Sequence, residues 1–255
     1  MSGRVDTAVI LAAGMGSRLA SEMDDRPKGL MVLGDRPIIE ESISKLFQAG
    51  IERVVLVTGH MRETYEAFAA GFPGNVETVH NERFYDSGSM YSLYCARHLL
   101  EGDFLLLESD LIYEDRALKE TLEAEGDSCI LLSDWTESGD EVFVCARDGR
   151  LMDMSKDRSS LPEPPVGELV GITRISAELF QKMTEFSAGA FERDLMVDYE
   201  TDCLVGVAPV HLIECHVVEG LLWAEIDDPD HLARARGLVY PAIRARDALP
   251  ALRDR

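Results

Sequence analysis

The sequence predicts an α/β fold in which helices cover both faces of a mixed, mostly parallel central sheet. Short apolar runs typical of buried strands alternate with segments whose apolar residues recur at helical spacing. The first run, residues 7–11, opens directly into a glycine-containing loop. After about residue 145 the alternation gives way to short strands and loops. We therefore expect a mixed rather than a purely parallel sheet.

In the first half of the chain, strands and helices are expected to follow one another closely. Residues 37–50 are the clearest helix, because Ile39, Ile43 and Leu46 recur at helical spacing and Gly50 stands where a helix is expected to stop. The apolar run from Phe104 to Leu107 is expected to be a central strand. The full set is strands at 7–11, 53–59, 76–80 and 104–107, and helices at 37–50, 62–70 and 89–100.

In the second half, strands are expected at 130–133 and 141–145. The dipeptide Asp148-Gly149 after the second of them is a strong hairpin signal. Residues 163–167, which include two prolines, are expected to be a loop, and a final helix is expected to begin near His231. We interpret residues 1–245 as one catalytic domain, with an acceptor-binding part at roughly 130–220, and residues 246–255 as a C-terminal tail.

The chain is strongly acidic. Its 255 residues carry 47 Asp and Glu against 25 Lys and Arg, a formal net charge of −22. Such a surface repels nucleic acids and anionic membranes, so neither is an expected partner. The five cysteines form no C-x-x-C pair, and the sequence shows no signal peptide and no apolar run of membrane-spanning length. We expect a cytoplasmic protein with reduced thiols and no membrane insertion.

The loop after the first strand has the composition of a phosphate-binding loop. Gly14 and Gly16 allow the backbone to approach a ligand closely, and Arg18 and Lys28 follow as fixed cations. A dinucleotide fingerprint is excluded because Leu19 stands where its third small residue is required. A Walker A loop is excluded as well. Its lysine comes directly after the second glycine, whereas Gly16 is followed here by Ser17 and the lysine comes only at position 28.

Carboxylates follow two apolar strand-like runs far apart in the sequence. Asp110 comes after the run 104–107, and Asp227 follows Leu222-Trp223-Ala224. Acidic residues at carboxyl ends of strands point into the ligand crevice of an open α/β sheet, and two carboxylates with phosphate oxygens suit Mg²⁺. The alternative is a helix cap, which the sequence Asp227-Asp228-Pro229 also fits.

The sequence LAAGMGSRL at 11–19, with PKGL at 27–30, resembles the signature loop of nucleotidyltransferases that move an NMP from an NTP to a phosphorylated small molecule. The resemblance is to the phosphocholine and 2-aminoethylphosphonate cytidylyltransferases in particular. It implies a three-layer αβα Rossmann-like nucleotidyltransferase fold. It also implies that Arg18 and Lys28 are the catalytic cations and that the triphosphate lies on Leu11, Ala12, Ala13, Gly14, Met15, Gly16 and Ser17.

The same resemblance extends to the metal and the base. It implies that Asp110 and Asp227 hold Mg²⁺. The segment 81–92 is similar to one that places the nucleotide in cytidylyltransferases, which implies nucleotide contacts from Asn81, Gly88, Ser89 and Ser92. This chain departs from those relatives at Gly88 and Ser89, where they often carry two asparagines.

Two further segments are implied to bind the acceptor. Lys156 matches a lysine that meets the acceptor phosphate, and the acidic segment 198–202 matches a pocket wall made by Tyr199, Glu200 and Asp202. An acidic pocket suits an acceptor with an amine, through charge-assisted hydrogen bonds. A quaternary ammonium would instead require an aromatic cage, for which the sequence offers Tyr85, Tyr199 and Trp223.

The predicted reaction is transfer of CMP from CTP to 2-aminoethylphosphonate or phosphocholine, with release of pyrophosphate and with Mg²⁺ as cofactor. One alternative is a sugar-1-phosphate nucleotidyltransferase that uses UTP, GTP or dTTP. A catalytically silent nucleotide-sensing subunit is the alternative from another class, although it would have little need of all four residues Arg18, Lys28, Asp110 and Asp227. Whether the chain forms a homodimer is left open.

Overall fold

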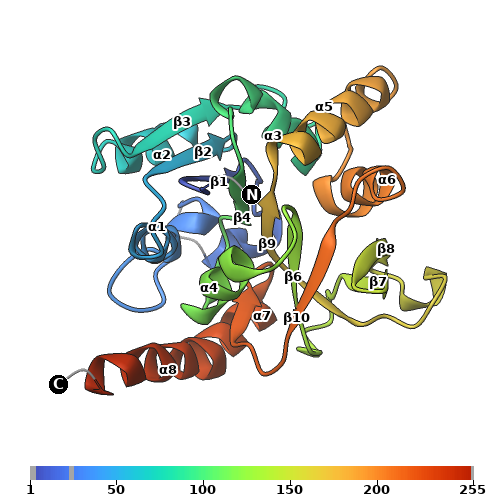
Figure 1. Cartoon of the computed structure of the whole chain (residues 1–255). Coiled ribbons are helices and arrows are strands. Elements are labelled where there is room, and N and C mark those ends of the chain that lie inside the picture. Colours follow the sequence, from blue (N-terminus) through green and yellow to red (C-terminus); the bar gives the residue numbers. More distant parts are fainter. Residues whose placement is uncertain (1–3, 23–25, 254–255) are drawn as a thin grey trace.

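The computed structural model describes residues 4–22 and 26–253. Within them, a nine-stranded sheet crosses the molecule (Figure 1). Strands β9 and β8 run opposite to the others, because β9 pairs antiparallel with β4, β6 and β7, and β8 with β10 and β7. In spatial order the strands are β3 (Val76–His80), β2 (Arg53–Thr58), β1 (Thr7–Ala12), β4 (Phe104–Glu108), β9 (Gly167–Ile175), β6 (Cys129–Ser133), β10 (Glu214–Val218), β8 (Arg150–Ser155) and β7 (Phe143–Arg147).

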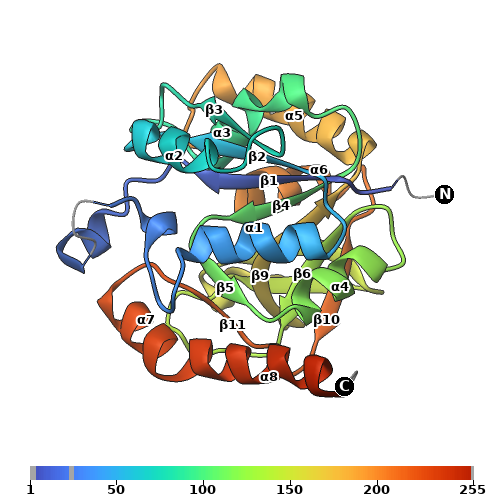
Figure 2. The same ribbon diagram turned by 90° about the vertical axis from the view of Figure 1, so that its left-hand side faces the viewer.

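Helices cover both faces of this sheet, as the alternation of side chains along the strands requires. On one face, Ile10 of β1 packs in a core with α1 (Ile38–Gln48), α2 (Arg62–Ala69) and α4 (Arg116–Glu123). On the other, Val9 packs in a core with α3 (Ser89–Cys95) and α5 (Ala177–Phe191). Figure 2 shows α1 lying across the near face, in front of β1 and β4. The predicted three-layer αβα arrangement with a mixed sheet is confirmed.

A third core holds the C-terminal helices against a small two-stranded sheet, β5 (Leu111–Tyr113) with β11 (Trp223–Glu225). Below it lie α7 (Pro229–Arg234), the π-helical turn η6 (Ala235–Val239) and α8 (Tyr240–Arg253) (Figure 2). The short elements that remain are α6 (Val205–Val207), η1 (Ser17–Glu22), η2 (Lys28–Leu30), η3 (Arg97–Leu99), η4 (Arg158–Ser160) and the π-helical turn η5 (Tyr199–Leu204).

The structure corrects some of the predicted bounds. The helix expected at 89–100 ends at Cys95, and the short turn η3 follows it. The strand expected at 141–145 begins only at Phe143. The final helix continues past residue 245 and reaches Arg253. Strand β9 and helix α5 were not predicted at all. Within the described residues, no helix combines the length and the apolar character that crossing a bilayer requires.

Candidate active site

The glycine loop lies at the carboxyl edge of the sheet. Strand β1 ends at Ala12, and Gly16 has a φ of 59°, in the left-handed region that favours glycine, before η1 begins. Two backbone bonds hold the loop between its neighbours: Ser109 N donates to Leu11 O at 3.1 Å, and His60 N donates to Ala13 O at 3.2 Å. The loop is thereby attached to the ends of both β4 and β2.

A cavity of about 210 Å³ lies beside this loop. Its lining includes the predicted cation Lys28 and the predicted metal ligand Asp110. Among the residues predicted to bind the nucleotide, the lining includes Leu11, Ala13, Gly14, Gly16, Gly88, Ser89 and Ser92. Three other predicted loop residues are not in the lining: Ala12 is buried, Met15 is exposed and Ser17 is the first residue of η1.

Asn81 also lies outside the lining of this cavity. It is fully buried after β3, and its amide Nδ2 donates to the hydroxyls of Ser87 and Ser92, both at 3.0 Å. Since Ser87 and Ser92 line the cavity, Asn81 supports the wall from behind. Its position favours an indirect role, through Ser92, over a direct contact with a nucleotide.

The central cation of the site is Lys28. Its ammonium forms ion pairs with both Asp110 and Asp227, which joins the two strand ends that the sequence analysis selected. Lys28 is itself positioned by its neighbour Gly29, whose N–H donates to the Tyr65 hydroxyl at 3.3 Å. A Cβ on Gly29 would stand 3.1 Å from both the backbone and the side chain of Ser109, so a larger residue would fit only if Ser109 moved slightly.

Lys28 and Asp227 stabilise each other's charged forms. Burial alone would lower the pKa of Lys28, but Asp110 and Asp227 outweigh it and raise that pKa above its usual range. Burial likewise opposes the charge on Asp227, yet Lys28 and Arg18 lower the pKa of this carboxyl to about 2. Lys28 and Asp227 are therefore both charged at neutral pH.

Further ion pairs link Asp227 to Lys156, the lysine predicted to contact the acceptor. Arg18 Nη2 lies 3.2 Å from Asp227 Oδ2, and Arg18 Nη1 lies 3.8 Å from Asp140 Oδ2. The other oxygen of Asp140 accepts a bond from Lys156 Nζ at 2.9 Å. All three predicted phosphate-binding cations, Arg18, Lys28 and Lys156, are thus linked through carboxylates in one chain. Asp140, on the loop between β6 and β7, was not predicted from the sequence.

Two glutamates that were not predicted from the sequence also stand beside Asp110. Oxygens of Glu108, Asp110 and Glu225 all lie within 4.8 Å of one another. The structure brings them together because β5 and β11 pair with Leu111 opposite Glu225, and Ile226 N donates to Asp110 O at 3.2 Å. A signal was present in the sequence: each predicted aspartate belongs to a Glu-x-Asp triplet, 108–110 and 225–227. Residues two apart in a strand face the same side.

The predicted acceptor residues divide into two groups. Tyr199 is fully buried, and its neighbouring charges are Glu200, Glu108 and Glu225. Burial, with these carboxylates, raises the pKa of the Tyr199 phenol. Asp202 is exposed, and its Oδ2 accepts a bond from Asp198 N at 2.8 Å. Asp202 therefore stabilises the start of the turn η5, whereas Tyr199 and Glu200 reach the carboxylate cluster.

The segments predicted to bind the nucleotide and the acceptor are joined directly by hydrogen bonds. Met90 N donates to Val197 O at 3.0 Å, and Tyr199 N donates to Ser89 Oγ at 2.9 Å. A Cβ on Gly88 would stand 2.3 Å from Val197 O, so no larger side chain fits there without moving the backbone. This contact gives a physical reason for glycine at the first of the two positions where relatives often carry asparagine. It also makes the first turn of α3 depend on residues 195–199.

The donor set at the strand ends fits a hard divalent cation. Glu108, Asp110 and Glu225 offer three carboxylate oxygens within 4.8 Å of one another, and Asp227 stands across Lys28 from Asp110. Oxygen-only ligands of this kind suit Mg²⁺. The assignment to Asp110 and Asp227 thus stays a prediction that the chemistry of the donors supports. Asp228, next in sequence, is a helix cap: its carboxylate accepts a bond from His231 N at 2.8 Å.

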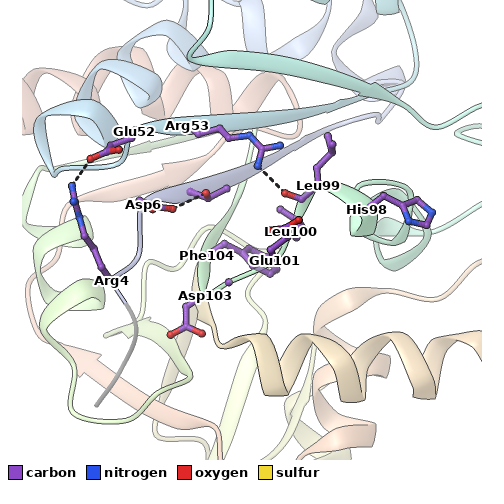
Figure 3. Close-up of a pocket in the computed structure, with 12 residues that line it drawn as sticks. Arg4, Asp6, Glu52, Arg53, His98, Leu99, Leu100, Glu101, Asp103 and Phe104 are labelled. Carbon is purple, nitrogen blue, oxygen red and sulfur yellow. Dashed lines mark hydrogen bonds and ion pairs between the residues drawn. The ribbon is translucent and has the colours of Figure 1, made fainter.

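A larger cavity, of about 670 Å³, lies at the opposite edge of the sheet, near the amino ends of β1 and β4 (Figure 3). Its arginines are already engaged: Arg4 pairs with Glu52, and Arg53 donates to Leu99 O at 2.8 Å (Figure 3). Ligand crevices of open α/β sheets lie outside the carboxyl ends of the strands. The smaller cavity beside the glycine loop is therefore the candidate active site.

This fold, with a cavity lined by a glycine loop, a buried lysine and strand-end carboxylates, is that of the nucleotidyltransferases. The chain belongs to the family of MobA-like NTP transferase domains, which it matches over residues 8–244. Nucleotidyltransferases of this kind generally use a divalent metal.

Two of the curated relatives that match most of the chain are named for aminoalkylphosphonates. The CMP-5'-(3-aminopropyl)phosphonate synthase of Streptomyces rubellomurinus is 29% identical over 231 residues, which are 87% of this chain and 37% of that protein. The 2-aminoethylphosphonate cytidylyltransferase of Lancefieldella rimae is 28% identical over 237 residues, 91% of this chain and 93% of that protein. The chain therefore spans just over a third of the first relative and nearly all of the second.

A solved structure confirms the fold over almost the whole chain. The inositol-1-phosphate CTP transferase from T. maritima superposes with a TM-score of 0.80 at 20% sequence identity, covering 97% of this chain and 98% of that one. At this identity the match concerns the fold, and the acceptor must be inferred from the site itself.

Proposed function

We propose that this chain transfers CMP from CTP to a small phosphonate or phosphate headgroup and releases pyrophosphate. The observation that carries the proposal is the continuous series of ion pairs that runs from Lys156 through Asp140, Arg18, Asp227 and Lys28 to Asp110. This series supports the proposal because it links three cations suited to phosphate groups with carboxylates suited to a divalent metal. Two of the relatives that cover most of this chain are named for aminoalkylphosphonates, as a CMP-(3-aminopropyl)phosphonate synthase and a 2-aminoethylphosphonate cytidylyltransferase, which supports the same reaction.

The residues fit an in-line displacement at the α-phosphorus of the nucleotide. An oxygen of the acceptor's phosphonate or phosphate attacks this phosphorus, and the bond to pyrophosphate breaks. No protein nucleophile is needed, so positioning and neutralisation of charge carry the catalysis. Arg18 and Lys28 would exchange their carboxylate partners for phosphate oxygens, and Lys156 would do the same for the acceptor. Bound at Asp110 and Asp227, Mg²⁺ would add positive charge and help align both substrates.

Among the acceptors, we place 2-aminoethylphosphonate ahead of phosphocholine. The site is rich in carboxylates, which favours an acceptor that carries an ammonium group over the phosphate ester of an uncharged polyol. Of the rings that the sequence offered for a quaternary-ammonium cage, Trp223 is buried and its Nε1 donates to Ser133 Oγ at 2.8 Å, whereas Tyr85 is 63% exposed. A primary amine, which donates hydrogen bonds, therefore fits better.

The direct test is pyrophosphate release measured over four NTPs combined with 2-aminoethylphosphonate, phosphocholine, inositol-1-phosphate and glucose-1-phosphate. We expect release with CTP and 2-aminoethylphosphonate to exceed every other combination. Release with sugar phosphates alone would contradict the headgroup assignment, and a clear preference for UTP, GTP or dTTP would contradict the assignment of cytosine.

Asp140 competes with phosphate for two cations in the ligand-free protein, so its charge is expected to weaken CTP binding. Asp140→Asn should therefore lower the KM for CTP by about two- to fivefold, because an exposed ion pair of this kind is worth up to about 1 kcal/mol. Steady-state kinetics with CTP varied at saturating acceptor measure this effect.

Asp148→Asn is the matched control for Asp140→Asn. It removes the same charge from the exposed turn that joins β7 to β8, at a φ of 52° that asparagine tolerates. We expect it to leave the KM for CTP at the wild-type value. A higher KM for CTP in Asp140→Asn would mean that Asp140 orients Arg18 for the nucleotide and does not compete with it.

A further inference from the structure

The loop between β6 and β7, residues 134–142, leaves and re-enters the sheet beside a single residue. Ser133 at the end of β6 and Phe143 at the start of β7 both pair with Glu168 of β9. Glu168 is buried, and its carboxylate accepts hydrogen bonds from the N–H and the hydroxyl of Thr136, both at 2.8 Å. The base of this loop is therefore fixed to the sheet.

Helix α7 binds the same loop through two side chains. Arg234 Nη2 donates to Thr136 O at 3.0 Å, and His231 Nε2 lies 3.2 Å from Ser138 O. The two side chains are three positions apart in the helix, so they lie on the same face of it. Both contacts go to backbone carbonyls, and they therefore fix the course of the loop itself.

His231 also contacts the segment that carries Asp227. Asp227 N donates to His231 Nδ1 at 3.4 Å. Because Nδ1 of the neutral ring accepts this bond, the ring proton lies on Nε2, which donates to Ser138 O. His231 is buried, so a single enclosed ring joins the backbone of Asp227 to the 134–142 loop.

Arg18 lies between the two segments that are joined in this way. Its guanidinium is 3.2 Å from Asp227 Oδ2 and 3.8 Å from Asp140 Oδ2. Among the described residues, Asp140 Oδ2 has no hydrogen-bond partner, so no direct bond sets its distance from Arg18. Lys156, which bonds the other oxygen of Asp140, has a side chain that is 60% exposed, and such a pair is a weak anchor. The distance between Asp140 and Arg18 is therefore set by the way the loop is held.

We propose that His231 and Arg234 are positioning residues, which hold the 134–142 loop so that Asp140 stays against Arg18 until the nucleotide binds. The proposal rests on the proposed function, in which Arg18 exchanges its carboxylate partners for phosphate oxygens. It adds two residues that set the affinity for the nucleotide through Asp140. Loosening the loop should free Arg18 and therefore strengthen nucleotide binding.

Arg234→Met is the first test. It removes the donor to Thr136 O and leaves the contact between His231 and Asp227 in place. We expect the KM for CTP to fall by about two- to fivefold, the same direction and upper limit as for Asp140→Asn, while kcat is retained. A substitution that only destabilised the fold would lower kcat and would not improve the affinity for CTP.

Arg53→Met is the matched control for Arg234→Met. Both arginines are half-buried and donate to a backbone carbonyl, but Arg53 donates to Leu99 O at 2.8 Å, at the opposite edge of the sheet. We expect Arg53→Met to keep the wild-type KM for CTP.

His231 is tested by two amides of different length. In His231→Asn the side-chain oxygen can still accept the Asp227 N–H, but the side chain is too short to reach Ser138 O. The KM for CTP should then fall as in Arg234→Met. In His231→Gln the longer amide can donate to Ser138 O, so the KM for CTP should stay close to the wild-type value.

A double-mutant cycle tests whether the effect passes through Asp140. The variant that combines Asp140→Asn with Arg234→Met should have the KM for CTP of Asp140→Asn alone, because the position of the loop no longer matters once the charge is gone. Additive effects would show that Arg234 acts by another route and would overturn the proposal. A higher KM for CTP in Arg234→Met or His231→Asn would overturn it as well.

Equilibrium binding separates this proposal from the proposed function. Calorimetry with CTP alone reports the affinity for the nucleotide whether or not transfer occurs. Tighter CTP binding in Arg234→Met and His231→Asn, combined with no transfer to any acceptor, would overturn the reaction and leave the role of the loop in place. Transfer of CMP with unchanged CTP affinity in both variants would do the reverse.

Discussion

Lys28→Met is expected to lower kcat/KM for CMP transfer by about 10²–10³-fold, the usual effect of removing one charge-stabilising donor. The variant should also become dependent on Mg²⁺ for stability. Lys28 is the cation between Asp110 and Asp227, and its loss leaves two carboxylates facing each other. We expect a lower Tm without metal and a larger rise in Tm on addition of Mg²⁺ than in the wild type.

Lys45→Met is a closely matched control for Lys28→Met. Lys45 also bridges two aspartates, Asp115 and Asp247, with both contacts at 2.5 Å, and its side chain is 15% exposed against 14% for Lys28. It lies between α1 and α8, away from the candidate site. We expect Lys45→Met to lower the Tm while transfer is retained. Normal kinetics in Lys28→Met would show that the loop neutralises the triphosphate without Lys28.

Asp110→Asn is expected to abolish measurable turnover, with a loss of at least about a hundredfold, while the protein stays folded. The substitution keeps the size of the side chain but removes a charged oxygen ligand from the group that includes Glu108 and Glu225. Pyrophosphate release measures turnover, and circular dichroism measures folding. Mn²⁺ binding, followed by electron paramagnetic resonance, should weaken in parallel.

Asp115→Asn serves as the control for Asp110→Asn, because it removes an aspartate that pairs with a lysine outside the site. It should keep both Mn²⁺ binding and turnover. Undiminished pyrophosphate release from Asp110→Asn would remove the metal assignment. Lost turnover with unchanged Mn²⁺ affinity would give Asp110 a different role, the orientation of Lys28.

Local sequence patterns were sufficient to predict the first four strands of the sheet and the glycine loop. Strands β1, β2, β3 and β4 were predicted almost to the residue. For β1, β2 and β4 the reason is a nearly continuous apolar run with polar residues at its ends. The glycine loop and the positions of Arg18 and Lys28 could also be predicted, because they lie within one short stretch of the sequence. The family match confirms the class of protein that these patterns indicated.

Strand β9 shows why other elements could not be predicted. Its sequence contains Glu168 and Arg174 as well as Gly171, which has a φ of 79°. These are poor signals for a central strand. Glu168 is accommodated because Thr136 donates to it, and Arg174 because it donates to the carbonyls of Leu122 and Ala124. The partners come from distant segments, so no local pattern reveals them.

By itself, the sequence determined the class of fold and the glycine loop, and it predicted the two strand-end aspartates, because each of these follows from a short stretch of the chain. Only the tertiary structure decided which groups share the site. It placed Lys28 between Asp110 and Asp227, added Glu108, Glu225 and Asp140, and moved Asn81 and Asp202 to supporting positions. The physical reason is the long-range pairing of β5 with β11, in which contacts between residues more than a hundred positions apart set the register of the carboxylates.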